Sequence, residues 1–343
     1  MKKRAPKRPA TMADIAALAG VAASTVSRAL AGSPLVAKKK REEIIKLARE
    51  RGYVINTAAR NLRLKRTETI SVVIPLGHEA SQPLSDPFFV EILGNLADEI
   101  TQRGYGVFVQ KVLPPMDDWL NKIIMGHRSD GIIVIGQSTE HDKLEAASAH
   151  YRPLVVWGGH TAHQSYCTVG TDNVAGAFAA VEHLIRLGRR RIAFIGERKS
   201  PEIQLRYAGY RQALHRGGAL EAQQIVSAHL TADAAYEAMR AFISGGAKFD
   251  AVFAATDVIA MSAIRAVTAA GLRVPQDVAV VGYDDIMLAA HTNPALTTVR
   301  QDMKRGAETL VHLIFRRIAG EDTPSATMPA ELIVRESCGA SRS

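Results

Sequence analysis

From Ile70 onward, short runs of consecutive apolar residues alternate with longer stretches in which apolar residues recur at helical spacing, such as Phe89 to Gln102. Such alternation is typical of parallel β-sheets covered by helices on both faces. The runs form two sets: ISVVIP (70–75), VFVQKV (107–112), GIIVIG (131–136) and PLVVWG (153–158), then RIAFIG (191–196), QIVSA (224–228), AVFAAT (251–256) and VAVVGY (278–283). We therefore expect two α/β lobes with doubly wound parallel sheets, and a ligand crevice where the carboxyl ends of their strands face one another.

The residues before this region have a helical pattern. Thr11 stands three residues before Asp14, a spacing that predicts a capped helix beginning at Met12. The expected apolar face of this helix consists of Ile15, Ala16, Leu18 and Ala19. Gly20 can adopt the left-handed conformation that ends a helix. A second short helix follows, so the segment predicts a helix-turn-helix.

The second helix has two distinct faces. Val26 and Leu30 lie one turn apart and are expected to pack against the first helix. The opposite face carries small, polar and cationic side chains, namely Ser24, Thr25 and Arg28. Such a face suits the major groove of DNA, and we expect Ala23 to Arg28 to enter it.

A third helix is predicted from Lys38 to Arg51. Its first turn carries Lys38, Lys39 and Lys40 at the positive end of the helix dipole, which is unfavourable by roughly 0.3 kcal/mol or more for each charge. A nearby phosphate backbone would reverse the sign, but an ordinary solvated charge run explains the three lysines equally well. Residues 56–68 are polar and basic, and we expect a linker that becomes helical only when it is held in place.

The positive charge of the chain is concentrated at one end. Of the 343 residues, 1–66 hold 17 Lys and Arg against 4 Asp and Glu, a net +13, whereas the remainder has a net charge of −4. A basic head on a mildly acidic body is typical of a protein that neutralises DNA phosphates with a dedicated module. The length allows two or three domains with sizeable cores, and no unbroken apolar stretch is long enough for a membrane span.

The N-terminal sequence also allows a second interpretation. MKKRAPKR followed by an alanine-rich run resembles a secretory signal, with a basic and then an apolar part. Asp14 interrupts the run, and alanine and glycine make it weakly hydrophobic, so the helix-turn-helix is favoured. Cys167 and Cys338 lie far apart without metal-ligand spacing, which indicates a reducing compartment and no disulfide framework.

Motifs of enzymatic chemistry are missing from the sequence. It contains no G-x-S-x-G, G-x-x-x-x-G-K or G-x-G-x-x-G pattern, so we expect neither a hydrolase nucleophile nor a nucleotide-binding loop, and no enzyme. His160 and His163 would bind a metal only if a helix or turn aligned them, and a solvated loop is favoured. We expect no metal and no cofactor.

Ordered motifs cover nearly the whole length of the chain. The head contains T-x-x-D-I-A-x-x-A-G-V-x-x-x-T-V-S-R-x-L from Thr11, GYxxN (52–56) and AARNL (58–62). The body contains DPFF (86–89), DNxxGAxxAxxHLxxxGxRRIAFIG (172–196), RxxGY (206–210), VxVVGYDD (278–285) and LTTVRQD (296–302). Together they resemble the lac-repressor-like (LacI/GalR) family of bacterial transcription regulators. The resemblance implies an all-α helix-turn-helix head and a two-lobed body similar to a periplasmic sugar-binding protein.

The resemblance also implies which residues contact DNA: Thr11, Ala23, Ser24, Thr25, Ser27, Arg28, Asn56, Ala59, Leu62 and Arg63. Ala23 and Ser24 match the positions that mostly set sequence choice. Because both side chains are small, they should make few direct contacts with base edges. Arg28 and DNA shape should therefore contribute more of the sequence specificity.

Two further implications concern the linker and the helix starts. Residues 56–68 correspond to the family's hinge helix, whose Ala59 and Leu62 positions enter the minor groove and wedge a base step. The alternative for Leu62 is packing on the body. Ala22 and Ala37 replace serines that usually begin the second and third helices, and each missing cap costs about 1 kcal/mol. We therefore expect a head that is marginal alone and is ordered by DNA.

In the body, the resemblance points to a small-molecule effector held between the lobes. The candidate residues are Phe88, Phe89, Gln137, Trp157, Arg206, Asp257, Asp284 and Gln301. Arg206 offers a rigid fork of donors suited to vicinal hydroxyls or a carboxylate. Asp257 can instead cap the helix that begins at Val258, and Trp157 and one phenylalanine can instead be core residues. Acidic residues facing an arginine favour a neutral polyol, so we expect a mono- or disaccharide.

The expected organisation is a DNA-binding domain (1–55), a hinge (56–68) and a two-lobed effector-binding and dimerisation domain (69–343). The N-lobe is expected to comprise about 69–169 and 300–326, and the C-lobe about 170–299 and 327–340. The resemblance implies a cytoplasmic homodimer that binds a palindromic operator, without membrane contact; no leucine-rich tail for a tetramer follows Arg335. Sugar binding would change the lobe angle and shift the operator equilibrium. The alternatives are an exported sugar-binding protein, and a regulator acting by co-effector binding or activation.

Overall fold

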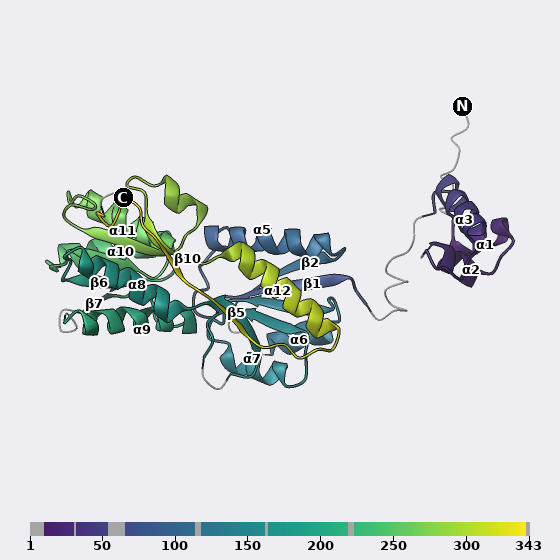
Figure 1. The fold of residues 1–343 in the computed structure, drawn as a ribbon, viewed down its shortest axis with the longest axis horizontal. Helices are drawn as coiled ribbons and strands as arrows, with labels where there is room; N and C mark the ends of the chain where they lie inside the picture. The colour runs from purple at the N-terminus through teal and green to yellow at the C-terminus, as the bar shows by residue number, and fades with distance from the viewer. Residues whose placement is uncertain are drawn as a thin grey trace, which may run out of the picture. The chain divides into compact units, whose positions relative to one another are not determined.

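The computed structural model describes residues 10–30, 32–53, 66–113, 118–161, 164–218 and 223–340, and the chain divides into two compact units, 1–66 and 67–343 (Figure 1). The first unit is the helical head, and the second is an α/β body. No single described helix is long and apolar enough to cross a membrane. Helices α1 and α2 pass that test of length and composition only as a pair, bent by 100°.

The head consists of α1 (Met12–Ala19), α2 (Ala23–Leu30) and α3 (Lys38–Glu50). The predicted capping box is present, because the Thr11 hydroxyl accepts from the Asp14 backbone N–H while the Asp14 carboxylate accepts from the Thr11 N–H at 2.8 Å. Gly20 ends α1 in the left-handed conformation, with φ of 63°. The small core contains Ile15, Ala16, Ala19, Val26, Ala29, Val36 and Ile44.

One expectation for the head needs correction. Leu18 is 47% exposed, because the buried face of α1 is narrower than expected and is formed by Ile15, Ala16 and Ala19. Leu30 packs against this core as expected, although it is only half-buried, and Ala29 is fully buried beside Val26.

The N-lobe is built on a six-stranded parallel sheet in the order β11-β5-β4-β3-β1-β2. Its strands are β1 (Thr69–Pro75), β2 (Gly106–Val112), β3 (Gly131–Ile135), β4 (Leu154–Trp157), β5 (Cys167–Thr171) and β11 (Ala326–Met328). Helices α5 (Pro87–Gln102) and α12 (Met303–Ile318) cover one face, and α6 (Trp119–Met125) and α7 (His141–Ser148) cover the other (Figure 1). Both faces of the central strands are buried, which explains their continuous apolar sequences.

The C-lobe repeats this design with the strand order β12-β10-β9-β8-β6-β7, in which β12 is antiparallel to β10. Its strands are β6 (Ile192–Ile195), β7 (Gln224–Val226), β8 (Ala251–Ala254), β9 (Ala279–Asp284), β10 (Thr297–Arg300) and β12 (Glu331–Ile333). Helices α8 (Asn173–Arg186) and α9 (Pro201–Arg216) lie on one face, and α10 (Ala232–Ser244) and α11 (Asp257–Ala269) lie on the other (Figure 1). A 3₁₀ turn, η2 (Met287–His291), follows β9.

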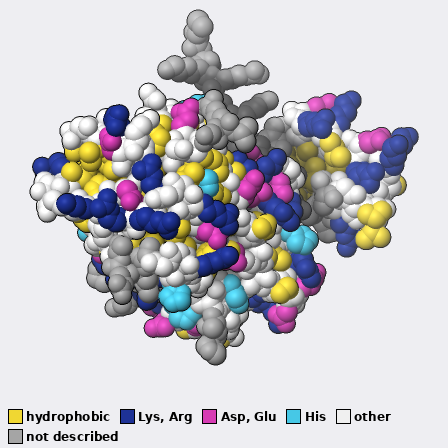
Figure 2. Space-filling model, turned by 60° about the vertical axis from the view of Figure 1, so that its left-hand side comes forward, with side chains coloured by type: hydrophobic (Ala, Val, Ile, Leu, Met, Phe, Trp, Pro, Cys, Tyr) yellow, Lys and Arg dark blue, Asp and Glu magenta, His cyan; other side chains and the backbone are white. Residues whose placement is uncertain are grey.

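The chain passes between the lobes after β5, after β10 and after β11. These strands end at Thr171, Arg300 and Met328. Each of the eight apolar runs contains a strand, whereas β5, β10, β11 and β12 were not anticipated as strands. On the face drawn in Figure 2, apolar, basic and acidic side chains are interspersed, as is usual for surfaces in contact with water.

Candidate functional site

The outward face of α2 presents the side chains expected to contact DNA. Ala23, Ser24 and Arg28 are exposed, while Thr25 and Ser27 are half-buried. The inner face is held by Val26, which is fully buried. The helix therefore offers small and cationic groups on a rigid support, the arrangement that allows a helix to approach base edges in a groove.

The other residues expected at DNA fall into two groups. Thr11 closes the capping box of α1, where its hydroxyl lies 2.7 Å from the Asp14 carboxylate. Asn56, Ala59, Leu62 and Arg63 lie outside the described residues. At the start of α3, Ala37 makes no side-chain cap, as the sequence indicates.

A cavity lies between the carboxyl ends of the two sheets, with a space of about 650 Å³ between its walls, including its open mouth. Both lobes contribute to the walls: segments that follow β1 and β3 face segments that follow β6, β7, β8 and β9. Open α/β sheets bind ligands in this position, because strand ends and helix N-termini converge there. Of the predicted residues, the lining includes Phe88, Phe89, Trp157, Arg206, Asp284 and Gln301.

Arg206 is fixed in place before any ligand arrives. It projects from α9 and is 95% buried, with only 5% of its surface exposed. Its Nε donates to Asn173 Oδ1 at 2.8 Å, and one terminal nitrogen donates to the Ala255 carbonyl at 2.6 Å. The guanidinium also lies 3.8 Å from the centre of the Tyr283 ring, within cation–π distance. The donors that remain are presented to the cavity by a rigid fork.

Asp284 faces Arg206 from the end of β9, with 3.4 Å between its Oδ1 and the Arg206 guanidinium. Gln301 donates to the same oxygen at 2.7 Å. Burial raises the pKa of Asp284 to about 7, against the opposing effects of Arg206 and Gln301. The φ of Asp284 is 124°, a conformation that non-glycine residues rarely adopt. Strain of this kind is typical of positions held for a function.

Three aromatic rings form apolar walls. Phe88 and Phe89 open α5 after the cap Asp86, and their ring centroids lie 5.7 Å apart in an edge-to-face arrangement. Phe89 is buried and Phe88 half-buried, so one of them belongs to the core as the sequence allowed, yet both line the cavity. Trp157, at the end of β4, is likewise both a core residue and part of the wall.

Several polar wall residues were missed by the sequence reasoning: His78, Gln82, Asp86, Ser138, Ser200, Glu202 and Thr256. Thr256 ends a predicted strand, and Ser138 and His78 follow predicted strands within three residues, so the rule that sites form at strand ends would have found them. Glu202 also accepts from the Gln137 backbone N–H at 2.9 Å, which joins the two lobes. Within the part of the chain that the structure describes, the buried Oε1 of Gln82 has no hydrogen-bond partner.

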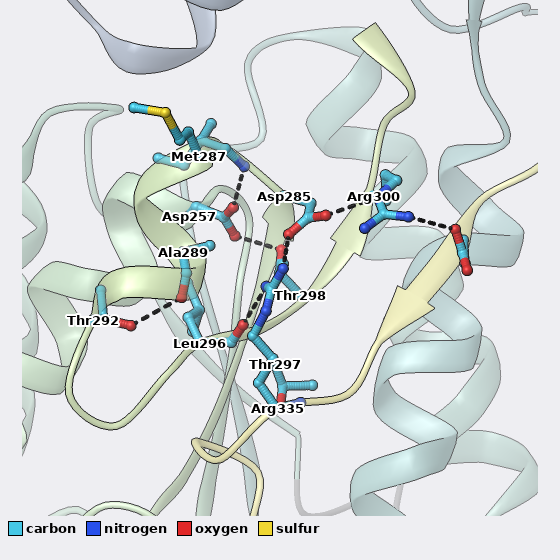
Figure 3. A network of polar contacts seen from close by, with 12 residues as sticks. Asp257, Asp285, Met287, Ala289, Thr292, Leu296, Thr297, Thr298, Arg300 and Arg335 are labelled. Carbon is cyan, nitrogen blue, oxygen red and sulfur yellow. Dashed lines mark hydrogen bonds and ion pairs between the residues drawn. The ribbon is translucent and has the colours of Figure 1, made fainter. Parts of the chain in front are cut away.

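Two predicted residues do not line the cavity. Gln137 is fully buried and donates to the Tyr166 hydroxyl at 2.8 Å, so it supports the wall from behind. Asp257 accepts from the Ile286 N–H at 3.0 Å and from the Thr298 hydroxyl at 2.5 Å (Figure 3). It is not the cap of α11 either, because Thr256 has that role. Asp257 instead holds the strand-end turn that carries Asp284.

The next residue of that turn is also anchored. Asp285 accepts from Arg300 at 2.8 Å and from Arg335 at 2.6 Å, so its carboxylate joins β10 to the C-terminal segment (Figure 3). Asp284 and Asp285 thus point to different partners, one toward the cavity and one toward the strand that continues to the N-lobe.

Comparison with known proteins agrees with this arrangement. Residues 11–56 match the model of bacterial regulatory proteins of the lacI family, and residues 181–338 match a periplasmic binding protein-like domain. The regulator CelR of Thermobifida fusca is 34% identical, and the alignment covers 96% of this chain and 99% of CelR. The chain belongs to the lacI family. It is a DNA-binding transcriptional regulator, as the sequence motifs predicted.

Further lacI-family relatives extend along the whole chain. The repressor CytR of Escherichia coli K12 is 30% identical, with 98% of both proteins covered. Among solved structures, the lac repressor dimer bound to operator and an anti-inducer has a TM-score of 0.86 at 25% identity and covers 97% of this chain and all of that one. A complex of CelR with cellobiose has a TM-score of 0.70 at 30% identity, covering 96% and 99%. The predicted fold, a helix-turn-helix head and two parallel-sheet lobes, is confirmed.

Proposed function

We propose that this regulator represses carbohydrate-utilisation genes, and that a small sugar bound in the cavity between the lobes changes its affinity for operator DNA. The observation that carries the proposal is the pairing of Arg206 with Asp284 at the cavity wall, beside the aromatic rings of Phe88, Phe89 and Trp157. The solved complex of the relative CelR with cellobiose supports a sugar as the ligand class.

The chemistry of the walls favours a neutral sugar over an anion. Carboxyl groups of Asp86, Glu202 and Asp284 outnumber the one arginine in the lining, so the wall offers an anionic ligand no net positive charge. Hydroxyl groups can donate to these carboxyl oxygens and to the free Oε1 of Gln82. The aromatic rings offer apolar faces for the C–H groups of a pyranose. A mono- or disaccharide has hydroxyl groups for the polar part of the wall and C–H groups for the aromatic part.

The proposed mechanism follows from the way the lobes are connected. Contacts such as that between Glu202 and Gln137 join the lobes across the cleft, and a ligand that touches both lobes favours one angle between them. In a homodimer, this angle would set the spacing of the two hinges (56–68) and heads (1–55) on a palindromic operator. Because linkage is reciprocal, operator DNA must change the affinity for sugar by the same factor. The protein would act in the cytoplasm, where its operator is found.

A thermal-shift screen of the full chain against mono- and disaccharides tests this function. A sugar at 100 times its dissociation constant should stabilise the protein by about 2.7 kcal/mol. The sugars that raise the unfolding temperature are then added to the complex of the protein with DNA from the upstream region of its own gene. Fluorescence anisotropy should report release of this DNA. Failure of every sugar to shift the unfolding temperature would contradict the effector class, and stronger DNA binding would make the sugar a co-repressor. Cleavage of the cellular protein near residue 25 would favour the exported alternative.

A further inference from the structure

A cluster of three potential metal ligands lies at the rim of the cavity, outside the site described above. Glu79, Glu197 and His229 place one donor atom each within 4.8 Å of the other two. Glu79 belongs to the N-lobe, in the turn after β1, whereas Glu197 follows β6 and His229 follows β7 in the C-lobe. The neighbours His78 and Leu230 line the cavity, so the cluster joins the lobes beside its mouth.

Each carboxylate in the cluster is oriented by a partner of its own. Glu79 Oε1 accepts hydrogen bonds from the backbone N–H and the hydroxyl of Ser81, and Glu197 Oε1 lies 2.7 Å from Lys199 Nζ. The second oxygen of each carboxylate, Oε2, is thereby turned toward His229. The distances to His229 Nδ1 are 2.7 Å from Glu79 and 3.0 Å from Glu197. Metal ligands are commonly fixed in this way by an outer shell of hydrogen bonds.

The buried oxygen of Glu79 is placed where a cation would stabilise it. Glu79 is only 7% exposed, and among the described residues its buried Oε2 accepts no well-directed hydrogen bond, although it lies 2.7 Å from His229 Nδ1. A buried carboxylate oxygen that lacks a donor is costly, and a second carboxylate close by adds repulsion. A cation between the three groups would remove both penalties. His229 is half-exposed, with 55% of its side chain accessible, so the place can be reached from solvent.

We propose that Glu79, Glu197 and His229 bind a divalent transition-metal ion that bridges the two lobes. One imidazole and two carboxylates form a donor set suited to Zn²⁺ and its neighbours, whereas Mg²⁺ and Ca²⁺ prefer oxygen ligands alone. Three protein ligands leave coordination positions for water, as in open zinc sites. Because the ligands come from both lobes, the bound ion favours the arrangement in which the lobes are closed on one another.

Isothermal titration calorimetry of the full-length, chelator-treated protein with ZnCl₂ tests the site. We expect one Zn²⁺ per chain, and a Co²⁺ adduct with visible d–d absorption. His229→Gln and Glu79→Gln should each weaken binding by more than the 10- to 100-fold typical of an outer-shell change, and Ser81→Ala should fall within that range. Mg²⁺ should not compete. Small-angle scattering should show a Zn²⁺-dependent decrease in the radius of gyration that His229→Gln abolishes.

His215→Gln is the matched control, because this histidine is exposed on α9 of the same lobe and lies outside the cluster. It should bind Zn²⁺ as the wild type does. Circular dichroism establishes whether each variant is folded. If Glu79→Gln is unstable, His229→Gln still tests the site, because His229 is exposed enough for its variant to fold. Absence of Zn²⁺ binding, or binding that survives both ligand substitutions, would overturn the proposal, and an imidazolium shared by the two carboxylates would then explain the cluster. The readout does not depend on sugar or operator, so it stands apart from the proposed function.

Discussion

The indole of Trp157 packs against Gly306 so closely that a methyl group added to Gly306 would overlap the ring. Trp157 ends β4 and lines the cavity, and Gly306 lies in the first turns of α12, the helix that follows the passage from the C-lobe. The position of the cavity wall therefore depends on a residue without a side chain.

Gly306→Ala should lower the free energy of unfolding by about 1–3 kcal/mol, the usual cost of overpacking a core, and should weaken sugar binding by displacing Trp157. Gly94→Ala is the control, because an added Cβ on Gly94, which is exposed within α5, meets no atom within 4 Å. That substitution should stabilise the helix by about 0.5–1 kcal/mol. Urea denaturation and calorimetry measure both effects, and equal behaviour of the two variants would refute the packing argument.

Arg206→Ala should remove the response at wild-type sugar concentrations while operator binding is retained. The substitution removes the charged donors at the cavity, and a charged hydrogen bond contributes roughly 1.5–3 kcal/mol, which corresponds to about a 10- to 150-fold loss of sugar affinity. The comparison is Arg211→Ala, an exposed arginine on the same helix. Operator release is followed by anisotropy as sugar is added. Release of the Arg206→Ala protein at the wild-type sugar concentration would rule out this role.

The titration of Asp284 should make stability depend on pH in a defined direction. Burial raises its pKa from 3.8 to about 7, so the folded protein holds a proton that the unfolded chain has lost. The stabilisation is complete below about pH 4, declines as pH rises and is lost above about pH 7. The difference in unfolding free energy between wild type and Asp284→Asn should therefore decrease over this interval and become constant above it. A difference that stays level from pH 4 to 8 would contradict the raised pKa.

Sequence reasoning identified the lobes because their central strands are buried on both faces and therefore read as unbroken apolar runs. It did not identify β5 or β10, since CTVGT and TTVR contain small and polar residues. In β10 the partners lie far away in the sequence: the Thr297 backbone N–H donates to the Ser337 hydroxyl, and the Thr298 hydroxyl donates to Asp257. The edge strands β11 and β12 have three residues each, too few to show a period.

Only part of the candidate site could be predicted from the sequence, because long-range partners decide which residues line the cavity. Arg206, Asp284 and Gln301 lie in motifs of the family and do line the cavity. Asp257 lies beside the same strand ends, yet its carboxylate is directed into the protein by Thr298, which arrives from β10. Whether a strand-end residue faces a ligand or its own turn depends on such long-range partners, and residue type alone does not reveal them.

Asp257→Ala should destabilise the body and weaken sugar binding less than Asp284→Ala does, because Asp257 acts on the cavity only through the turn that carries Asp284. The substitution leaves the buried Ile286 N–H and Thr298 hydroxyl without their acceptor, which costs about 1–3 kcal/mol for each unsatisfied group. Thermal unfolding and calorimetry at low temperature separate the two effects. A loss of affinity as large as that of Asp284→Ala would restore Asp257 to the site.

The head should gain stability from a single restored cap. Ala37 stands at the N-cap of α3 without a side-chain hydrogen bond, and the first turn that follows contains no acidic residue. Ala37→Ser would provide an oxygen for the unpaired backbone N–H groups, a contribution of about 1 kcal/mol. In the isolated fragment 1–66, which we expect to be marginally folded without DNA, this change should raise the helical circular dichroism and the midpoint of urea unfolding. Ala17→Ser, at an exposed position beyond the first turn of α1, has no unpaired helical N–H groups to bond and should give no gain. An unmodified fragment that is already fully folded, or a serine at 37 without effect, would show that packing around Val36 and Ile44 holds the head and that the missing caps are immaterial.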